Sequence, residues 1–369
     1  MGMHMFEPIK PYNDLPGLPP DGIDLEPKET LKLAIRANRA LAELKSMTGR
    51  LPNPRVLIQA LSLQEAKGSS AIEGIVTTHD ELYKAMAQRA EADLAPHTKE
   101  VLRYQEAIAL GVDWVKRGNP ICTRLYETLV QKIKDNQSSV RKIPGTQLRS
   151  SLTNQIIYTP PEGEQVLRNK LANLDSFLND QIAPDVDPLI KMAVAHYQFE
   201  AIHPFHDGNG RVGRLLNILF LVQKNLLIDP TLYLSGYIFS HRTYYYSLLQ
   251  DVTTKQAWQP WIHYMLTAVE STARETINEI QAIETCMSDF KRKMQETCPR
   301  AYSKELLDLL FEKPYCRIKN LIDRDLGTRL TVTRYLQDLT NNDLMTELKS
   351  GREKIYVNHL FLEVLRKER

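Results

Sequence analysis

One stretch of twelve residues, HPFHDGNGRVGR at 203–214, brings two histidines, an aspartate and two arginines around a Gly-Asn-Gly run. The glycines directly precede a helical pattern, which predicts a nest of backbone N–H groups that binds anions at a helix N-terminus. Arg211 and Arg214 lie three residues apart, so they share one helix face and would bind the same anion. This pattern indicates a polyphosphate site that is not a Walker loop, because GxxxxGK[ST] is absent.

Two other side chains of this stretch could carry out chemistry on a bound phosphate. Asp207 is next to the nest, where its carboxylate would repel phosphate unless a Mg²⁺ ion lay between them. His203 precedes it by four residues, and an imidazole with a near-neutral pKa is a natural general base for a hydroxyl nucleophile. The combination predicts nucleotidyl or phosphoryl transfer to an alcohol or a phenol.

A metal-dependent hydrolase is an alternative interpretation of the same residues. Glu200, His203, His206 and Asp207 could form a metal cluster, and the ExxH spacing is present. HExxH and a zinc-type triad are absent, so phosphate chemistry is favoured. His206 is then expected to pack or to orient its neighbours.

The stretch resembles, without departure, the signature HPFx[DE]GNGRxxR of the Fic family, and the likeness extends over roughly residues 30–270. The best-known members are protein adenylyltransferases, helical bundles that bind ATP with Mg²⁺ and join AMP to a Tyr, Ser or Thr hydroxyl of a target protein. The resemblance implies a base at His203, a Mg²⁺ ligand at Asp207, a phosphate hole at Gly208, Asn209 and Gly210, and outer-phosphate contacts at Arg211 and Arg214. Kinase-like relatives carry a lysine at the position of Gly210, so the glycine indicates AMP transfer.

The same resemblance assigns two segments outside the signature. The strand-like run QIIYT falls at the family's flap, so Ile156, Ile157 and Tyr158 are expected to dock the target by β-strand addition. HRTYYYSLL resembles the segment that lines the adenine pocket, which places Tyr245 and Tyr246 there. Aromatic core packing is the alternative for each of these two tyrosines.

A second motif, SSAIEGI, resembles the inhibitory motif [ST]xxxE[GN] of the same family, with Ser69, Glu73 and Gly74 at its fixed positions. Its place before the signature is that of class II Fic proteins, whose inhibitory helix is N-terminal and on the same chain. The carboxylate of Glu73 would compete with the γ-phosphate for Arg214 and so inhibit transfer. An ordinary surface glutamate is one alternative. In some relatives this glutamate positions a water that removes AMP, so de-AMPylation is another.

Helical periodicity surrounds these motifs and predicts a mainly α fold: a Fic helical bundle with a small β-hairpin flap, followed by a C-terminal winged helix. The second helix is expected to stop at Gly68. The expected regions are an extended N-terminal arm at 1–29, a helical region with the inhibitory motif at 30–117, the Fic core at 118–270, a helical linker at 271–299 and the winged-helix domain at 300–369.

The last 70 residues follow a helix, helix, helix, hairpin order, with Arg329 and Arg334 on the third helix. A DNA-binding regulator with a nucleotide-sensing Fic domain is therefore an alternative function. The segment 300–369 has 14 Lys and Arg against 11 Asp and Glu, a modest excess for a DNA-binding surface. Winged helices also dock proteins or form dimers.

Composition is that of a soluble globular protein, with 43% hydrophobic and 25% charged residues. A net charge of +2 argues against a globally basic nucleic-acid coat. The four cysteines are scattered without metal spacing, and neither a signal peptide nor a membrane-spanning run is apparent, so we expect a cytoplasmic protein with reduced thiols and no membrane partner. Expected partners are a target protein with a reactive hydroxyl, the chain itself through self-modification, and a second copy in a homodimer.

Overall fold

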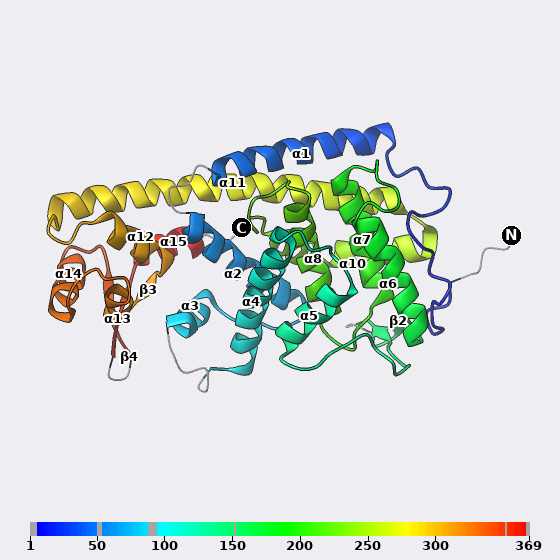
Figure 1. Ribbon diagram of the computed structural model, residues 1–369, viewed down its shortest axis with the longest axis horizontal. Coiled ribbons are helices and arrows are strands. Elements are labelled where there is room, and N and C mark those ends of the chain that lie inside the picture. The colour runs from blue at the N-terminus through cyan, green and yellow to red at the C-terminus, as the bar shows by residue number, and fades with distance from the viewer. Residues whose placement is uncertain (1–5, 50–53, 88–93, 151–152, 351–352, 367–369) are drawn as a thin grey trace.

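Helices make up most of the chain in the computed structural model, which describes residues 6–49, 54–87, 94–150, 153–350 and 353–366 (Figure 1). The helices are α1 (Lys28–Thr48), α2 (Pro54–Ile72), α3 (His79–Ala87), α4 (Pro96–Lys116), α5 (Thr123–Lys134), α6 (Glu164–Leu178), α7 (Pro188–Ile202), α8 (Asn209–Gln223), α9 (Leu234–Ser240), α10 (Arg242–Lys255), α11 (Trp258–Thr297), α12 (Lys304–Glu312), α13 (Ile318–Ile322), α14 (Arg329–Asn341) and α15 (His359–Arg366). The strands are β1 (Leu148–Arg149), β2 (Ile156–Tyr158), β3 (Tyr315–Cys316), β4 (Thr346–Ser350) and β5 (Glu353–Val357). The expected fold class, mainly α with small antiparallel sheets, is confirmed.

Helices α7 and α8 form the centre of the bundle. In each of them 13 of the 15 residues are buried, so they are covered on all sides, and in α8 the buried residues include Arg211 and Arg214. Helices α4, α5, α6 and α11 pack around this pair. The 203–208 loop joins the end of α7 to the start of α8 and is therefore held by the most buried part of the fold.

Helix α11 runs for 40 residues, about 60 Å at the standard helical rise, and α1 lies along it. Figure 1 shows this helix extending from the bundle to the C-terminal region. The segment 271–299, expected as a helical linker, is largely the second part of α11 and continues the first without a break.

The C-terminal region contains the expected order of three helices and a hairpin, as α12, α13, α14 and the β4–β5 pair. Strand β3 adds a third strand beside β5, which gives the sheet order β3-β5-β4. Arg329 and Arg334 are exposed on α14. All four cysteines are free thiols, and within the described residues none of the helices has both the length and the apolar character needed to cross a bilayer.

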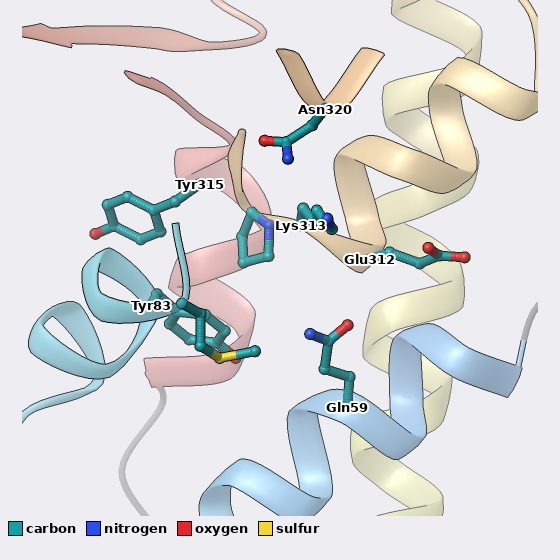
Figure 2. Close-up of a pocket in the computed structure, with 8 residues that line it drawn as sticks. Gln59, Tyr83, Glu312, Lys313, Tyr315 and Asn320 are labelled. Carbon is teal, nitrogen blue, oxygen red and sulfur yellow. The ribbon is translucent and has the colours of Figure 1, made fainter. Parts of the chain in front are cut away.

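A small pocket lies where the C-terminal region meets α2 and α3. Figure 2 shows Gln59 of α2 and Tyr83 of α3 on one side, with Tyr315 and Asn320 on the other. The Tyr315 hydroxyl donates a hydrogen bond to Asp80 Oδ1 at 3.0 Å, and the rings of Tyr315 and Tyr83 stack with centroids 6.0 Å apart. The C-terminal region therefore packs against α2, which contains the start of the expected inhibitory motif, and α3, which follows the motif.

The expectation that the second helix stops at Gly68 is wrong, because α2 continues to Ile72. The glycine serves a close contact instead. A Cβ atom at Gly68 would lie 2.6 Å from the hydroxyl oxygen of Tyr233 and 2.8 Å from its Cε2. Tertiary packing thus explains a glycine that local propensity suggests is a helix end.

We expect Gly68→Ala to lower the free energy of unfolding by about 1–3 kcal/mol, the usual cost of overpacking. A glycine-to-alanine change inside a helix with free space would instead raise it by roughly 0.5–1 kcal/mol. The two effects have opposite signs, so urea unfolding followed by circular dichroism separates them. A variant as stable as the parent chain, or more stable, would contradict the packing explanation.

Candidate active site

The 203–208 loop is closed by backbone geometry and by two side chains. His203 ends α7 in the left-handed conformation with φ 50°, and Gly208 precedes α8 with φ 87°. The Asn209 side chain accepts a hydrogen bond from the Phe205 N–H and donates one to the Phe205 carbonyl, both at 2.8 Å. These bonds show that the Asn209 side chain, which is 2% exposed, shapes the loop, and its place in the phosphate hole stays a prediction.

Arg141, which belongs to no motif of the sequence, also holds the 203–208 loop. Its Nε donates to the His203 carbonyl at 2.8 Å, its Nη2 donates to the Pro161 carbonyl at 2.5 Å, and its backbone N–H donates to the Pro204 carbonyl at 2.8 Å. The loop and the segment that follows β2 are therefore fixed to one guanidinium group.

The first turn of α8 presents backbone N–H groups that have no partner inside the helix, which is general for a helix N-terminus. Gly208 and Gly210 lie at this turn, where Gly208 is buried and Gly210 is half-buried. The aligned peptide dipoles add partial positive charge there, which favours an anion.

Arg214 is buried and faces the end of α2. Its guanidinium donates to Ser69 Oγ and to the Ser69 carbonyl, both at 2.9 Å, and to Glu73 Oε1 at 2.7 Å. Burial alone would raise the pKa of Glu73, but the attraction of Arg214 outweighs it and the pKa is lowered. Gly74 follows with φ 80°, a left-handed conformation typical of a helix end. Ser69, Glu73 and Arg214 thus meet although 141 residues separate the two charges.

Gly210 is required for this approach. A Cβ atom there would lie 2.3 Å from Glu73 Oε1 and 2.9 Å from Arg214 Nη1. The carboxylate therefore reaches the first turn of α8 itself, where the anion site is expected.

Asp207 is largely exposed at 65% and pairs with two cations. Its Oδ2 is 2.6 Å from Lys134 Nζ, and its Oδ1 is 3.7 Å from Arg211 Nη2. Burial would raise the pKa of Asp207, but the hydrogen bond from Lys134 outweighs it, so the carboxylate is ionised at neutral pH. Arg211 is also bound by Glu100, with Nη1 and Oε1 2.5 Å apart.

His203 is held as a neutral imidazole. Its Nδ1 donates to the Glu200 carbonyl at 3.3 Å, which leaves Nε2 as the proton acceptor. Burial, together with the positive charge of Arg141, lowers the pKa of His203 to about 4. The ring is therefore unprotonated at neutral pH and can accept a proton, although its pKa lies below the near-neutral value expected from the sequence.

The hydrolase alternative finds no support in the geometry. Within the part of the chain that the structure describes, His, Cys, Asp and Glu side chains form no group of three or more suited to a metal ion. His206 is exposed, whereas Glu200 is half-buried beside Gly213, where a Cβ atom would lie 2.3 Å from Glu200 Oε1.

The two tyrosines expected at the adenine pocket differ in position. Tyr245 is 1% exposed, and its hydroxyl donates to His196 Nε2 at 2.8 Å, so it is part of the core. Tyr246 is 42% exposed, and its ring packs against that of Tyr245 with centroids 5.2 Å apart. Burial and the nearby charge of Glu73 raise the pKa of Tyr246 to about 12. Adjacent helical positions point in different directions, so of these two tyrosines Tyr246 is the one with an exposed ring.

The segment expected as the flap forms the β1–β2 pair, with Leu148 opposite Tyr158 and Arg149 opposite Ile156. Ile156 and Ile157 are half-buried. The Tyr158 side chain is buried and its hydroxyl donates to the Ala201 carbonyl at 2.7 Å, so its expected part in docking would be through the backbone and stays a prediction. Tyr158 therefore fastens the flap to the end of α7, two residues before the imidazole.

Three segments of the sequence match known protein families. Residues 31–113 match the Fic/DOC family N-terminal region, residues 121–221 match the Fic/DOC family, and residues 286–361 match the C-terminal domain of the SoFic-like protein adenylyltransferases. The chain belongs to the Fic family.

Curated relatives of this Fic chain are similar over limited stretches. Protein adenylyltransferase fic-1 of Caenorhabditis briggsae is 42% identical over 67 residues, 18% of this chain and 13% of the relative. Protein adenylyltransferase Fic of Aedes aegypti is 32% identical over 133 residues, 36% of this chain and 25% of the relative. A probable protein adenylyltransferase of Aquifex aeolicus is 39% identical over 70 residues, 19% of this chain and 21% of the relative.

Two solved structures show the same fold at low sequence identity. A Fic family protein from Desulfovibrio desulfuricans G20 has a TM-score of 0.58 and 17% identity, with 90% of this chain and 96% of that chain covered. Fic-1 from Caenorhabditis elegans has a TM-score of 0.53 and 20% identity, with 69% of this chain and 74% of that chain covered.

The site of this Fic chain combines residues from two of the matched segments. Glu73 and Glu100 come from the Fic N-terminal segment, whereas Arg211 and Arg214 come from the Fic segment. Glu100 and Lys134 carried no motif signal, and they are recognised only because α4 and α5 pack beside the start of α8.

Proposed function

We propose that this Fic-family chain is a nucleotidyltransferase that moves AMP from ATP to a Tyr, Ser or Thr hydroxyl of a target protein. The family matches and the relatives named protein adenylyltransferase support this reaction class. Glycine at position 210 supports AMP transfer in particular, because kinase-like relatives of the family carry a lysine there.

The observation that carries the proposal is the arrangement around the start of α8. Two buried guanidinium groups flank the helix N-terminus, and a neutral imidazole lies at the end of the preceding helix. Arg211 is 1% exposed, and among the described residues its Nε has no hydrogen-bond partner. Buried donors are rarely left unpaired, so this atom is evidence for an anion that completes the site.

In the proposed reaction His203 Nε2 accepts the proton of the target hydroxyl. The hydroxyl oxygen then forms a bond to the α-phosphorus of ATP, and the bond from that phosphorus to the bridging oxygen breaks, releasing pyrophosphate. The backbone N–H groups from Gly208 to Gly210, with Arg211 and Arg214, would hold the phosphates in line. Tyr246 would contact the adenine, with Tyr245 supporting it from the core.

The residues present fit a Mg²⁺ ion that arrives with ATP. Asp207 is exposed, ionised and next to the helix N-terminus, and protein Mg²⁺ sites often use only one or two carboxylates together with substrate phosphates. Asp207 would hold the ion, which when bound neutralises phosphate charge.

Glu73 is proposed to inhibit the site in the structure as it stands. It occupies the Arg214 guanidinium at 2.7 Å, the group proposed for an outer phosphate of ATP. When Arg214 cannot contact that outer phosphate, the α-phosphorus would lie out of line with the incoming hydroxyl.

The half-buried flap residues Ile156 and Ile157 are proposed to pair with the target backbone.

The position of the radioactive phosphate distinguishes this reaction from phosphorylation. We expect the Glu73→Gly chain, incubated with Mg²⁺ and a cell lysate, to add more label to protein from α-³²P-ATP than the Glu73→Gly, His203→Ala double variant does, and to add no more than that variant from γ-³²P-ATP. The double variant measures the label that kinases of the lysate transfer. Mass spectrometry should find one AMP added to a hydroxyl of the labelled protein. Label above that of the double variant from the γ position, or from neither position, would reject AMP transfer.

A further inference from the structure

Glu100 of α4 is a carboxylate at the edge of the proposed phosphate site. Its Oε1 accepts a hydrogen bond from Arg211 Nη1 at 2.5 Å and another from Lys134 Nζ at 2.8 Å. The same Lys134 ammonium lies 2.6 Å from Asp207 Oδ2. One glutamate therefore joins the proposed phosphate-binding arginine to the proposed metal ligand.

Helix α4 holds Arg211 at two points. Glu100 and Tyr104 are four residues apart and share one helix face. The Tyr104 hydroxyl donates to the Arg211 carbonyl at 3.3 Å, while Glu100 binds the guanidinium of the same residue. The backbone and the side chain of Arg211 are thus both fixed by one surface of α4.

The lysine is held in place as well. Lys134 lies in the last turn of α5, and its stem passes over the loop at Gly208, where a Cβ atom would lie 3.6 Å from Lys134 Cγ. Its ammonium is shared between Glu100 and Asp207, so it fixes the Asp207 carboxylate relative to α4.

A carboxylate at this place is unfavourable for ATP on charge alone. Burial would raise the pKa of Glu100, but its hydrogen bonds from Lys134 and Arg211 outweigh this effect, so the group is ionised and would repel phosphate. Its benefit has to come from the two cations that it orders.

We propose that Glu100 is a positioning residue of the nucleotide site, which holds Arg211 and, through Lys134, Asp207 in the arrangement that binds Mg²⁺ and ATP. The inference rests on the proposed function. Partners that orient a metal ligand typically contribute 10–100-fold to affinity or activity, roughly the effect expected here.

The test is isothermal titration of the full chain with α,β-methylene-ATP and Mg²⁺, which measures binding without turnover. Glu100→Gln removes a negative charge and is nevertheless expected to raise the Kd about tenfold. Glu100→Asp keeps the charge but is one methylene shorter, so it is also expected to weaken binding. If Glu100 affected binding only through its net charge, Glu100→Gln would bind the analogue more tightly and Glu100→Asp would have the Kd of the parent chain.

The matched control is Glu106→Gln. Glu106 lies on the same helix and pairs with Lys132 of α5. Glu106→Gln therefore removes one Glu–Lys ion pair between α4 and α5 and one negative charge, as Glu100→Gln does. An exposed pair of this kind contributes little, so the Kd should change by less than about twofold.

The outcomes separate the inference from the proposed function. Glu100 variants that keep the thermal midpoint and bind the analogue as well as the parent chain, or better, overturn the positioning role. If Glu100→Gln does not fold, Glu100→Asp decides the question by the same criterion. A parent chain that fails to bind the analogue with Mg²⁺ overturns the proposed function, and the inference with it.

Discussion

Replacing His203 with alanine is expected to lower the rate of AMP transfer by about 10²–10⁴-fold, the usual contribution of a positioned general base. The imidazole is neutral at physiological pH, and its Nε2 is the atom left free by the bond from Nδ1 to the Glu200 carbonyl. The measurement is incorporation of label from α-³²P-ATP, on the chain itself or on its target, in the Glu73→Gly background.

Nucleotide binding should survive this substitution, because the phosphate contacts proposed for Arg211 and Arg214 do not involve the imidazole. His206→Ala is the matched control, since His206 is an exposed histidine of the same loop and is expected to leave transfer close to the parent rate. If His203→Ala loses Mg²⁺·ATP binding together with activity, His203 is a structural residue of the loop and not the base.

Glu73→Gly is expected to raise AMP transfer by about 5–150-fold, the usual range of coupling between two sites. The substitution frees the Arg214 guanidinium from the carboxylate that lies 2.7 Å away. It also leaves a buried cation with Ser69 as its remaining polar contact among those described above, so the thermal midpoint should fall.

The freed Arg214 guanidinium also allows a second measurement, the effect of Mg²⁺·ATP on the thermal midpoint. Because a ligand that binds only the folded state stabilises it, Mg²⁺·ATP should raise the midpoint of the Glu73→Gly chain more than that of the parent chain. The double variant with His203→Ala should show this shift and no transfer. An activity no higher than that of the parent chain would show that Glu73 does not inhibit.

The catalytic candidates could be predicted because they are local in sequence. His203, Asp207, Arg211 and Arg214 fall within twelve residues, and one helix N-terminus brings them together. Glu73 is distant but carries a short motif of its own. The mainly α class followed from periodicity for the same reason, since each helix has its own pattern.

The residues that hold the site in shape could not be predicted in this way. Arg141 binds a carbonyl 62 positions away, and Glu100 binds a guanidinium 111 positions away, so neither has a local pattern. The misread end of α2 at Gly68 has the same origin, because the partner that requires a glycine there is Tyr233. Tyr245 and Tyr246 are neighbours in sequence, and only packing decides which ring faces outward.

The absence of a side chain at Gly210 has a consequence for how this chain is controlled. Any other amino acid would place a Cβ atom 2.3 Å from Glu73 Oε1, so the carboxylate reaches the start of α8 only because position 210 has no side chain. If Glu73 inhibits as proposed, the inhibitor is part of the same polypeptide and acts at a fixed effective concentration, which dilution of the protein cannot reduce. On this proposal, activation requires an event that moves the end of α2 away from Arg214.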